Sequence, residues 1–292
     1  SVAQMFNILE GFDLAGFGHN SARSLHVIGE AMRLAFADRF AHLGDPAFDP
    51  IPLTGLQCKA YAAARRQAID VRRGPVAAPV GDPWSFQPGG RPASGALRTG
   101  GDYADQHTTH LSVIDGERNM VSLTASLGQR FGSGILVPGT GVVLNNGLMW
   151  FDPEPGKINS IAPGKIALHA GTPVLAFDEQ GPLMAVGVPG GRMVLTSVLQ
   201  VVLNVLDYGL GIQHAISAPR SHAEVGPLWI DPRFPEEVMA ELRQIRDDVA
   251  ERAETYLISS YYGRPNGVLI NRETGLLHGG VEPYKMSTAI GV

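Results

Sequence analysis

The sequence of 292 residues lacks the features that define several classes of protein. It has one cysteine, Cys58, so an intramolecular disulfide framework is excluded. No apolar run approaches the roughly 20 residues of a membrane-spanning helix. Charged residues make up only 17% of the chain, and no cluster of Lys or Arg is dense enough for a nucleic-acid footprint. We therefore expect neither a membrane nor a nucleic acid as a partner.

The composition that remains is that of a globular protein with a net charge of -5. Hydrophobic residues make up 44% of the chain, which is enough for a substantial core and excludes wholesale disorder. The chain begins Ser-Val, without Met or a signal peptide, and enters an apolar segment almost at once. We expect a piece of a longer protein, which leaves a cytoplasmic and a periplasmic location both open.

The first third of the chain is predicted to be helical and to end in a linker. Apolar residues at helical spacing indicate a helix over 24–44, capped by Asn20 or Ser21, and a second helix over about 56–71. Residues 74–106 hold five prolines among many glycines, a composition typical of a flexible surface segment.

The rest of the chain alternates between hairpin and helix patterns. Period-2 alternation predicts three hairpins, at 109–127, 172–188 and 266–280. Helical patterns occupy 194–209, 211–220 and 235–252. Hairpins separated by apolar helices favour a layered α/β domain.

The stretch "DQHTTHLSVID" (105–115) opens a predicted strand with two threonines between two histidines. A metal site, a plain strand edge and a nucleophile are the three interpretations. At positions i and i+3 of a strand, His107 and His110 point to opposite faces, so they cannot chelate one ion without a bend. We therefore expect no metal here, and no motif in the chain calls for another cofactor.

A threonine that opens a strand becomes a nucleophile if the chain is cut in front of it. The α-amine that is freed has a pKa of about 7.7–8.0 and can take the hydroxyl proton near neutral pH. The segment up to Gln106 would supply a releasable peptide, and Thr108 opens the strand. Pro189, Gly190 and Gly191 can expose two N–H donors to an oxyanion. A plain strand-to-helix turn remains the alternative for this tripeptide.

Several segments together resemble the γ-glutamyltransferases (γ-glutamyltranspeptidases), members of the N-terminal nucleophile (Ntn) hydrolase superfamily. Those that resemble the small subunit are "TTHLSVID", "FGSGILVPGTGVVLNN", "PGG", "VLQVVLNVLDYGL" and "SAPRSH". Those that resemble the end of the large subunit are "MFNILEGFDL", "EAMRLAFADRFAHLGDP" and "CKAYAAA". The resemblance implies an α/β, four-layer αββα sandwich, partial here because the N-terminal part of the large subunit is absent. It divides the chain into a large-subunit-like segment, 1–107, with the linker at 74–106, and a catalytic segment, 108–292.

The resemblance also implies the catalytic roles. Thr108 matches the nucleophile, with autocatalytic cleavage at His107–Thr108. Thr109 and Ser126 match hydroxyls around it, and Ser126 stands where a threonine is usual. The two glycines of the PGG tripeptide match the oxyanion hole. Reaction would pass through an acyl-enzyme on Thr108 that water or an acceptor amine resolves.

The acyl pocket departs from the family pattern. The family holds the α-ammonium of a γ-glutamyl group with Asn, Gln and Asp, where this chain has two glycines and an indole. Asp152 is an alternative partner for the ammonium. An acyl group with a carboxylate or keto-acid would instead be favoured by Arg130, His169 and Arg192. Surface or structural use is the alternative for these three residues. The candidate substrate-binding residues are Gly128, Arg130, Gly147, Trp150, Asp152, His169 and Arg192.

Two functional hypotheses follow. One is an autoprocessed threonine amidohydrolase or acyltransferase that cleaves a γ-glutamyl or related N-acyl amide, with water or an amine as acceptor. The other is an unprocessed, non-catalytic homologue that serves as a binding or structural unit. Retention of Thr108, Ser126 and the PGG tripeptide favours the first hypothesis. The expected partners are the small-molecule substrate, the missing large-subunit segment and a homodimer of processed protomers.

Overall fold

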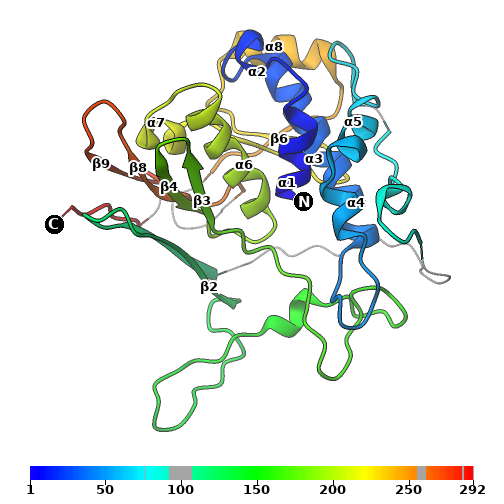
Figure 1. Cartoon of the computed structure of the whole chain (residues 1–292), viewed down its shortest axis with the longest axis vertical. Coiled ribbons are helices and arrows are strands. Elements are labelled where there is room, and N and C mark those ends of the chain that lie inside the picture. The colour runs from blue at the N-terminus through cyan, green and yellow to red at the C-terminus, as the bar shows by residue number, and fades with distance from the viewer. Residues whose placement is uncertain (76, 92–106, 255–260, 285, 292) are drawn as a thin grey trace.

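The computed structural model describes residues 1–75, 77–91, 107–254, 261–284 and 286–291 (Figure 1). A four-stranded antiparallel sheet in the order β3-β4-β8-β9 lies at its centre. Two helices, α6 and α7, pack on one face of this sheet, and the hairpin β1–β2 packs on the other. The bounds are β1 His107–Ile114, β2 Met120–Gly128, β3 Val174–Asp178, β4 Gly181–Gly187, β8 Asn266–Ile270, β9 Leu277–Val281, α6 Met193–Leu206 and α7 Ile212–Ser217.

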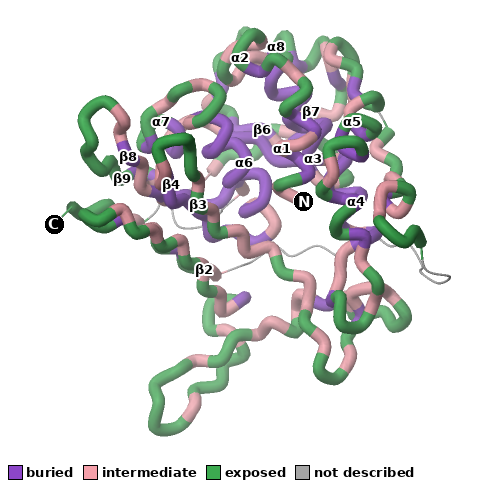
Figure 2. Tube along the Cα trace, viewed as in Figure 1, coloured by how far each residue is buried: buried purple, intermediate pink, exposed green. Residues whose placement is uncertain are grey.

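The remaining helices gather behind α6 and surround α3. Ser21 caps α3 by accepting a hydrogen bond from the Ser24 N–H (3.1 Å), as the sequence predicts. Figure 2 shows the buried residues concentrated in α1, α3, α6 and β4. The bounds are α1 Val2–Leu9, α2 Leu14–Phe17, α3 Ala22–His42, α4 Leu53–Gln57, α5 Lys59–Arg66, η1 Pro83–Phe86, η2 Gly147–Trp150, β5 Ser221–His222, β6 Leu228–Ile230, α8 Glu236–Ile245 and β7 Val249–Glu251.

The α/β class and the three predicted hairpins are confirmed. Two predicted helices differ from the structure. The helix expected over 56–71 is two short helices, α4 and α5, because Cys58 is extended between them and its Sγ accepts a hydrogen bond from the Tyr61 N–H (3.3 Å). The helix expected over 235–252 ends at Ile245. Arg246, the next residue, is fully buried and forms ion pairs with Glu30 and Asp248. The chain then continues as β7.

The described part of the predicted linker, residues 77–91, is partly exposed but is tied to the helices α3 and α5 by hydrogen bonds. Residues 77–91 contain η1, and the Gly81 N–H donates to the buried Asp38 carboxylate (2.7 Å). His42 Nε2 lies 2.9 Å from the Gly81 carbonyl, and Arg65 donates to the carbonyl of Pro79 (2.7 Å). Buried polar groups of α3 and α5 thus have the backbone of this stretch as a hydrogen-bond partner. Its predicted flexibility stays a prediction. Residues 76 and 92–106 lie outside the described residues.

The hairpin β1–β2 has a polar inner face and an apolar outer face. Inner side chains such as His110 and Thr124 face the central sheet and bond to each other (2.7 Å between Nδ1 and Oγ1). The outer face carries four aliphatic side chains that are 45–51% exposed: Leu111, Val113, Val121 and Leu123. The described residues thus form three layers of the predicted sandwich, and this aliphatic face is where a fourth would pack.

Candidate functional site

Thr108 lies where the strand pairing of β1 is irregular. His107 pairs with Gly128, Thr108 pairs with Ser126, and Leu127 is left opposite neither, so a register shift falls between His107 and Thr108. Gly128 has a φ of +83°, a conformation that favours glycine. Such irregularities re-aim side chains at the ends of strands. The bond predicted to be cleaved is the one at this shift.

The Thr108 hydroxyl has a second hydroxyl as its neighbour. Thr108 Oγ1 lies 2.9 Å from Ser126 Oγ, which accepts a hydrogen bond from the Gly128 N–H (3.1 Å). The Gly128 N–H occupies one lone pair of Ser126 Oγ, so the hydroxyl proton of Ser126 is available for a hydrogen bond with Thr108. The structure therefore brings together two of the residues that the sequence singled out. Thr109, the next residue, is exposed.

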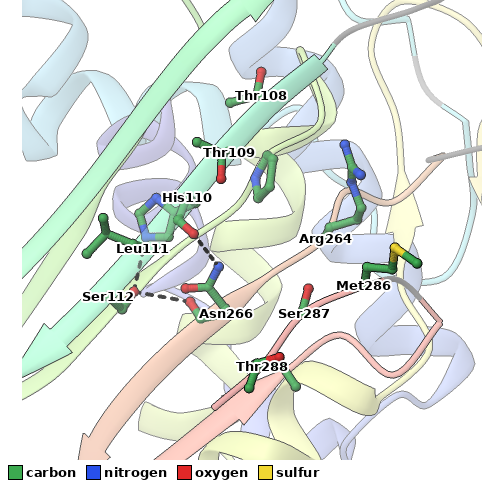
Figure 3. Close-up of a pocket in the computed structure, with 12 residues that line it drawn as sticks. Thr108, Thr109, His110, Leu111, Ser112, Arg264, Asn266, Met286, Ser287 and Thr288 are labelled. Atoms are coloured by element: carbon green, nitrogen blue, oxygen red, sulfur yellow. Dashed lines mark hydrogen bonds between the residues drawn. The ribbon is translucent and has the colours of Figure 1, made fainter. Parts of the chain in front are cut away.

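A cavity of about 250 Å³ runs along β1 from Thr108 (Figure 3). Residues 108–112 form one wall. The opposite wall consists of Arg264, Asn266, Val281 and residues 286–288, close to the end of the chain. Pro189, the first residue of the PGG tripeptide, also lines the cavity, which places that loop beside the Thr108 end.

His110 is buried at this cavity and connects several neighbouring residues by hydrogen bonds. Its Nδ1 lies 2.7 Å from Thr124 Oγ1, its Nε2 lies 3.0 Å from Ser112 Oγ, and its carbonyl accepts from Asn266 Nδ2 (2.9 Å). Burial lowers the pKa of His110 to about 4. At neutral pH the ring carries no charge, so it orders the strands around Thr108 without competing for an anion. The bonds of His110 to neighbouring hydroxyls indicate a structural role rather than metal binding.

The PGG tripeptide has the backbone geometry of an anion-binding turn. Gly190 has a φ of +145° and Gly191 a φ of +62°, so both favour glycine, and both are buried just before α6. Within the described part of the chain, no acceptor takes a hydrogen bond from either N–H. Buried, unpaired N–H groups are uncommon in proteins and suit a developing oxyanion. The Pro189 carbonyl accepts from the Arg264 N–H (2.9 Å), which fixes the loop.

The positions where the acyl pocket departs from the family pattern lie in a tightly filled segment. A Cβ added at Gly128 would come within 2.0 Å of Asn146 Oδ1. That oxygen accepts from the Gln129 N–H (2.9 Å), and the Asn146 amide donates to Gln129 Oε1 (2.9 Å). A Cβ at Gly147 would meet the Trp150 ring at 3.1 Å. A larger residue at Gly128 therefore has no room beside Asn146.

Trp150 and His169 pack against each other away from the Thr108 cavity. Their rings lie 4.6 Å apart, edge to face, and the His169 carbonyl accepts from the Arg39 guanidinium (3.0 Å). Asp152 forms an ion pair with Lys157 (3.1 Å), and Arg130 is exposed. None of these four predicted substrate-binding residues lines the cavity. Their predicted role in binding stays a prediction.

Arg192 is held by an internal partner. Its Nε donates to Glu224 Oε1 (2.8 Å), and its guanidinium lies over the Phe40 ring, 5.6 Å from the centroid. Burial alone would raise the pKa of Glu224. Hydrogen bonds from His222 and Arg192, together with their charges, lower it instead to about 2. The Glu224 carboxylate is thus ionised and paired with Arg192. This pairing favours a structural role for Arg192 over a role in substrate binding.

The sequence analysis missed the residues that face Thr108 across the cavity. Arg264 lies two residues before β8 and Asn266 begins it, whereas Ser287 and Thr288 lie near the end of the chain. The one available signal was "GRPNG", an arginine directly before a predicted strand. Nothing in the sequence says that this strand end faces β1, because that proximity arises from the packing of the two sheets.

Two features are absent from the described residues: a cluster of metal-ligating side chains and a membrane-spanning helix. Within them, no group of three or more His, Cys, Asp and Glu side chains could hold a metal ion. None of the helices that the structure describes is long and apolar enough to cross a membrane.

Comparison with known proteins agrees with the geometry. The sequence profile of the family described as Gamma-glutamyltranspeptidase matches residues 1–292. The chain is 37% identical over 237 residues to the Acylase ACY 1 proenzyme of Pseudomonas sp. (strain SE83), covering 81% of this chain and 39% of that relative. It is 33% identical over 290 residues to the Glutathione hydrolase proenzyme of Bacillus subtilis subsp. natto, covering 99% of this chain and 48% of that relative.

Solved structures give the same result. The crystal structure of cephalosporin acylase from Bacillus halodurans superposes with a TM-score of 0.78 and 28% identity, over 97% of this chain and 47% of that one. The chain thus spans about half the length of the relatives it matches, or less. The profile that matches the whole chain and the shared fold of Ntn hydrolases lead to one conclusion: this chain belongs to the gamma-glutamyltranspeptidase family.

Proposed function

We propose that this chain is the part of an Ntn hydrolase that carries the nucleophile, and that it cleaves a γ-glutamyl or related N-acyl amide. The observation that carries the proposal is the placement of Thr108. This residue begins β1 at a register shift, contacts the Ser126 hydroxyl and opens onto a cavity. Relatives named glutathione hydrolase proenzyme and acylase proenzyme support both the reaction class and the maturation by cleavage.

Maturation follows from the same geometry. Thr108 Oγ attacks the carbonyl carbon of His107, the C–N bond to Thr108 breaks, and the amide nitrogen takes a proton to become an α-amine. An ester between His107 and the threonine oxygen results, and water hydrolyses it. Cleavage therefore yields residues 1–107 and 108–292, and Thr108 becomes the N-terminus of the second.

In the acyl-transfer reaction the α-amine of Thr108 takes the hydroxyl proton while Oγ attacks the acyl carbon of the substrate. The N–H groups of Gly190 and Gly191 hold the oxyanion, a contribution that is typically worth about 10²–10³ in rate per donor. The amine half of the substrate takes this proton and leaves, and the acyl group remains as an ester on Thr108. Water then releases the acid, or an acceptor amine takes the acyl group.

The acyl group of this enzyme is proposed to differ from an ordinary γ-glutamyl group. The three polar contacts that the family pattern places around the α-ammonium are Gly128, Gly147 and Trp150 in this chain. The Asn146 side chain lies beside Gly128, and its amide is bonded to Gln129. The similarity to acylases, at an identity as high as that to glutathione hydrolases, supports a changed acyl specificity.

We also propose a protein partner for the aliphatic outer face of β1–β2. Leu111, Val113, Val121 and Leu123 are about half exposed there, and exposed apolar patches mark surfaces that are covered in the working assembly. The relatives are about twice as long as this chain. Polypeptide that corresponds to their additional length is the proposed partner.

The nucleophile is tested by intact-mass and N-terminal analysis of the protein and its Thr108→Ala variant. We expect the wild type to yield a fragment that begins at Thr108 and to hydrolyse an acyl amide. The Thr108→Ala variant should do neither. Thr140→Ala, an exposed threonine outside the cavity, is the matched control and should behave as the wild type. Turnover that survives in Thr108→Ala would refute the mechanism.

A further inference from the structure

The Arg264 side chain lines the Thr108 cavity, and within the described residues no hydrogen bond or ion pair engages its guanidinium. Figure 3 shows it extending toward the end of β1 that carries Thr108. The residue is partly buried and its Nε is buried, so part of the cation is removed from water without a compensating partner among the described residues. Removing a cation from water is costly unless it is paired, so an arginine in this state suits an anion.

The described residues that line the cavity around Arg264 carry no negative charge. Among these described residues, Arg264 alone has a formal charge at neutral pH, since burial keeps His110 neutral. Hydroxyl groups of Thr109, Ser287 and Thr288 line the same space. A cation with neutral hydroxyl donors around it forms a site for a small anion, and no carboxylate of the described lining competes for the guanidinium.

The backbone on both sides of Arg264 is fixed. Its N–H donates to the Pro189 carbonyl (2.9 Å), which ties it to the PGG turn. The Glu282 N–H donates to the Pro265 carbonyl (3.0 Å), and the buried Arg220 guanidinium pairs with Glu282 and donates to the Tyr262 carbonyl (3.2 Å). Arg220 of the "SAPR" motif thus anchors the wall that carries Arg264. The backbone from which the guanidinium extends is thus held in place before any ligand arrives.

We propose that Arg264 binds a carboxylate of the acyl-amide substrate beside Thr108. The proposal rests on the proposed function, since it names the substrate class of the same site. The planar guanidinium presents parallel N–H donors that match a carboxylate. The cavity, at about 250 Å³, is slightly below the ~300 Å³ at which typical small-molecule pockets begin, so it suits a short chain. Sequence analysis had given this role to Arg130, His169 and Arg192, none of which lines the cavity.

The first experiment measures binding alone and needs no turnover. Isothermal titration calorimetry with glutarate, and with uncharged glutaramide as the matched ligand, compares the wild type with Arg264→Gln and Arg264→Lys. We expect the wild type to prefer glutarate and Arg264→Gln to bind it about 10- to 100-fold more weakly, the range for losing hydrogen bonds to a charged group. Arg264→Lys should retain part of the affinity. Arg72→Gln, which changes an exposed arginine outside the cavity, should bind as the wild type.

The second experiment identifies the half of the substrate that carries the carboxylate. Glutaryl p-nitroanilide has it on the acyl group, N-butyryl p-aminobenzoate has it on the amine, and butyryl p-nitroanilide lacks it. Arg264→Gln should raise KM for one of the first two by about 10- to 100-fold and leave the third unchanged.

Failure of this proposal is distinguishable from failure of the proposed function. Equal glutarate affinity in the wild type and Arg264→Gln, or no glutarate binding by the wild type, overturns the role of Arg264 even if Thr108 is a working nucleophile. Glutarate binding that depends on Arg264, in a protein that cleaves no acyl amide, supports the anion site and overturns the reaction. Equal loss in Arg72→Gln would show a general charge effect and overturn the proposal.

Discussion

Gly187 gives the sharpest prediction about the support of the site. This residue of β4 faces His110 across the two sheets, and a Cβ added to it would come within 2.2 Å of His110 Cε1. The ring cannot move aside cheaply, because Thr124 (2.7 Å) and Ser112 (3.0 Å) bond to its two nitrogens. Gly187→Ala must therefore displace the imidazole or push the hairpin away from the central sheet.

The expected destabilisation has two parts. Forcing an extra carbon into a filled interior typically costs about 1–3 kcal/mol. Loss of the two short hydrogen bonds of His110 adds about 0.5–1.5 kcal/mol each. The sum is about 2–6 kcal/mol. At about 2–4 °C per kcal/mol for a domain of this size, even the lower end lowers Tm by about 4 °C.

Thermal and urea unfolding of Gly187→Ala measure this cost. The matched control is Gly116→Ala in the turn of the same hairpin, where an added Cβ would meet nothing within 4 Å. The control should unfold within about 0.5 kcal/mol of the wild type, as surface substitutions usually do. A Gly187→Ala protein as stable as the control would refute the claim that the ring of His110 is confined between the sheets.

Two further predictions concern the flanks of the site. The pKa of Glu224 is about 2 in the folded protein against an ordinary 4.5, so its contribution to stability is present above pH 4.5 and is lost as the pH falls toward 2. The pH dependence of the unfolding free energy should therefore be flatter over this window in Glu224→Gln, and an unchanged slope would contradict the ion pair with Arg192. On the outer face of β1–β2, Leu111→Ser with Leu123→Ser should reduce self-association and dye binding of the isolated chain while the circular dichroism spectrum stays the same; association equal to that of the wild type would show that this face is not the adhesive surface.

The helices and strands that follow a regular pattern were predictable. Apolar spacing placed α3 and α6, and alternation placed β1–β2, β3–β4 and β8–β9, because each pattern expresses one buried face of a regular element. Predictions failed where a single buried polar group redirects the chain. The helix α8 ends early at Ile245, and the next residue, Arg246, pairs with Glu30 and Asp248. The periodicity of apolar residues within a short segment of sequence carries no information about pairs of residues that are far apart in the chain.

The candidate site divides along the same line. Local spacing puts a threonine at a strand start and glycines at a strand-to-helix turn, so it indicated Thr108 and the PGG tripeptide as candidates. The resemblance to the γ-glutamyltransferases added Ser126. It assigned cationic groups to the substrate by their neighbourhood in the sequence, and Arg192 proved to be paired with Glu224.

By itself, the sequence determined the class of the fold and the hairpin that carries Thr108, and it singled out that residue as the candidate nucleophile. Alternation and turn residues are local properties, and they survive without knowledge of the partner strands. Only the tertiary structure decided that Arg264 and the end of the chain face Thr108. That proximity depends on how two sheets pack and on the buried pair of Arg220 with Glu282, which joins residues 62 positions apart. A long-range contact of this kind leaves no periodic trace in a single sequence, because the two partners are specified independently.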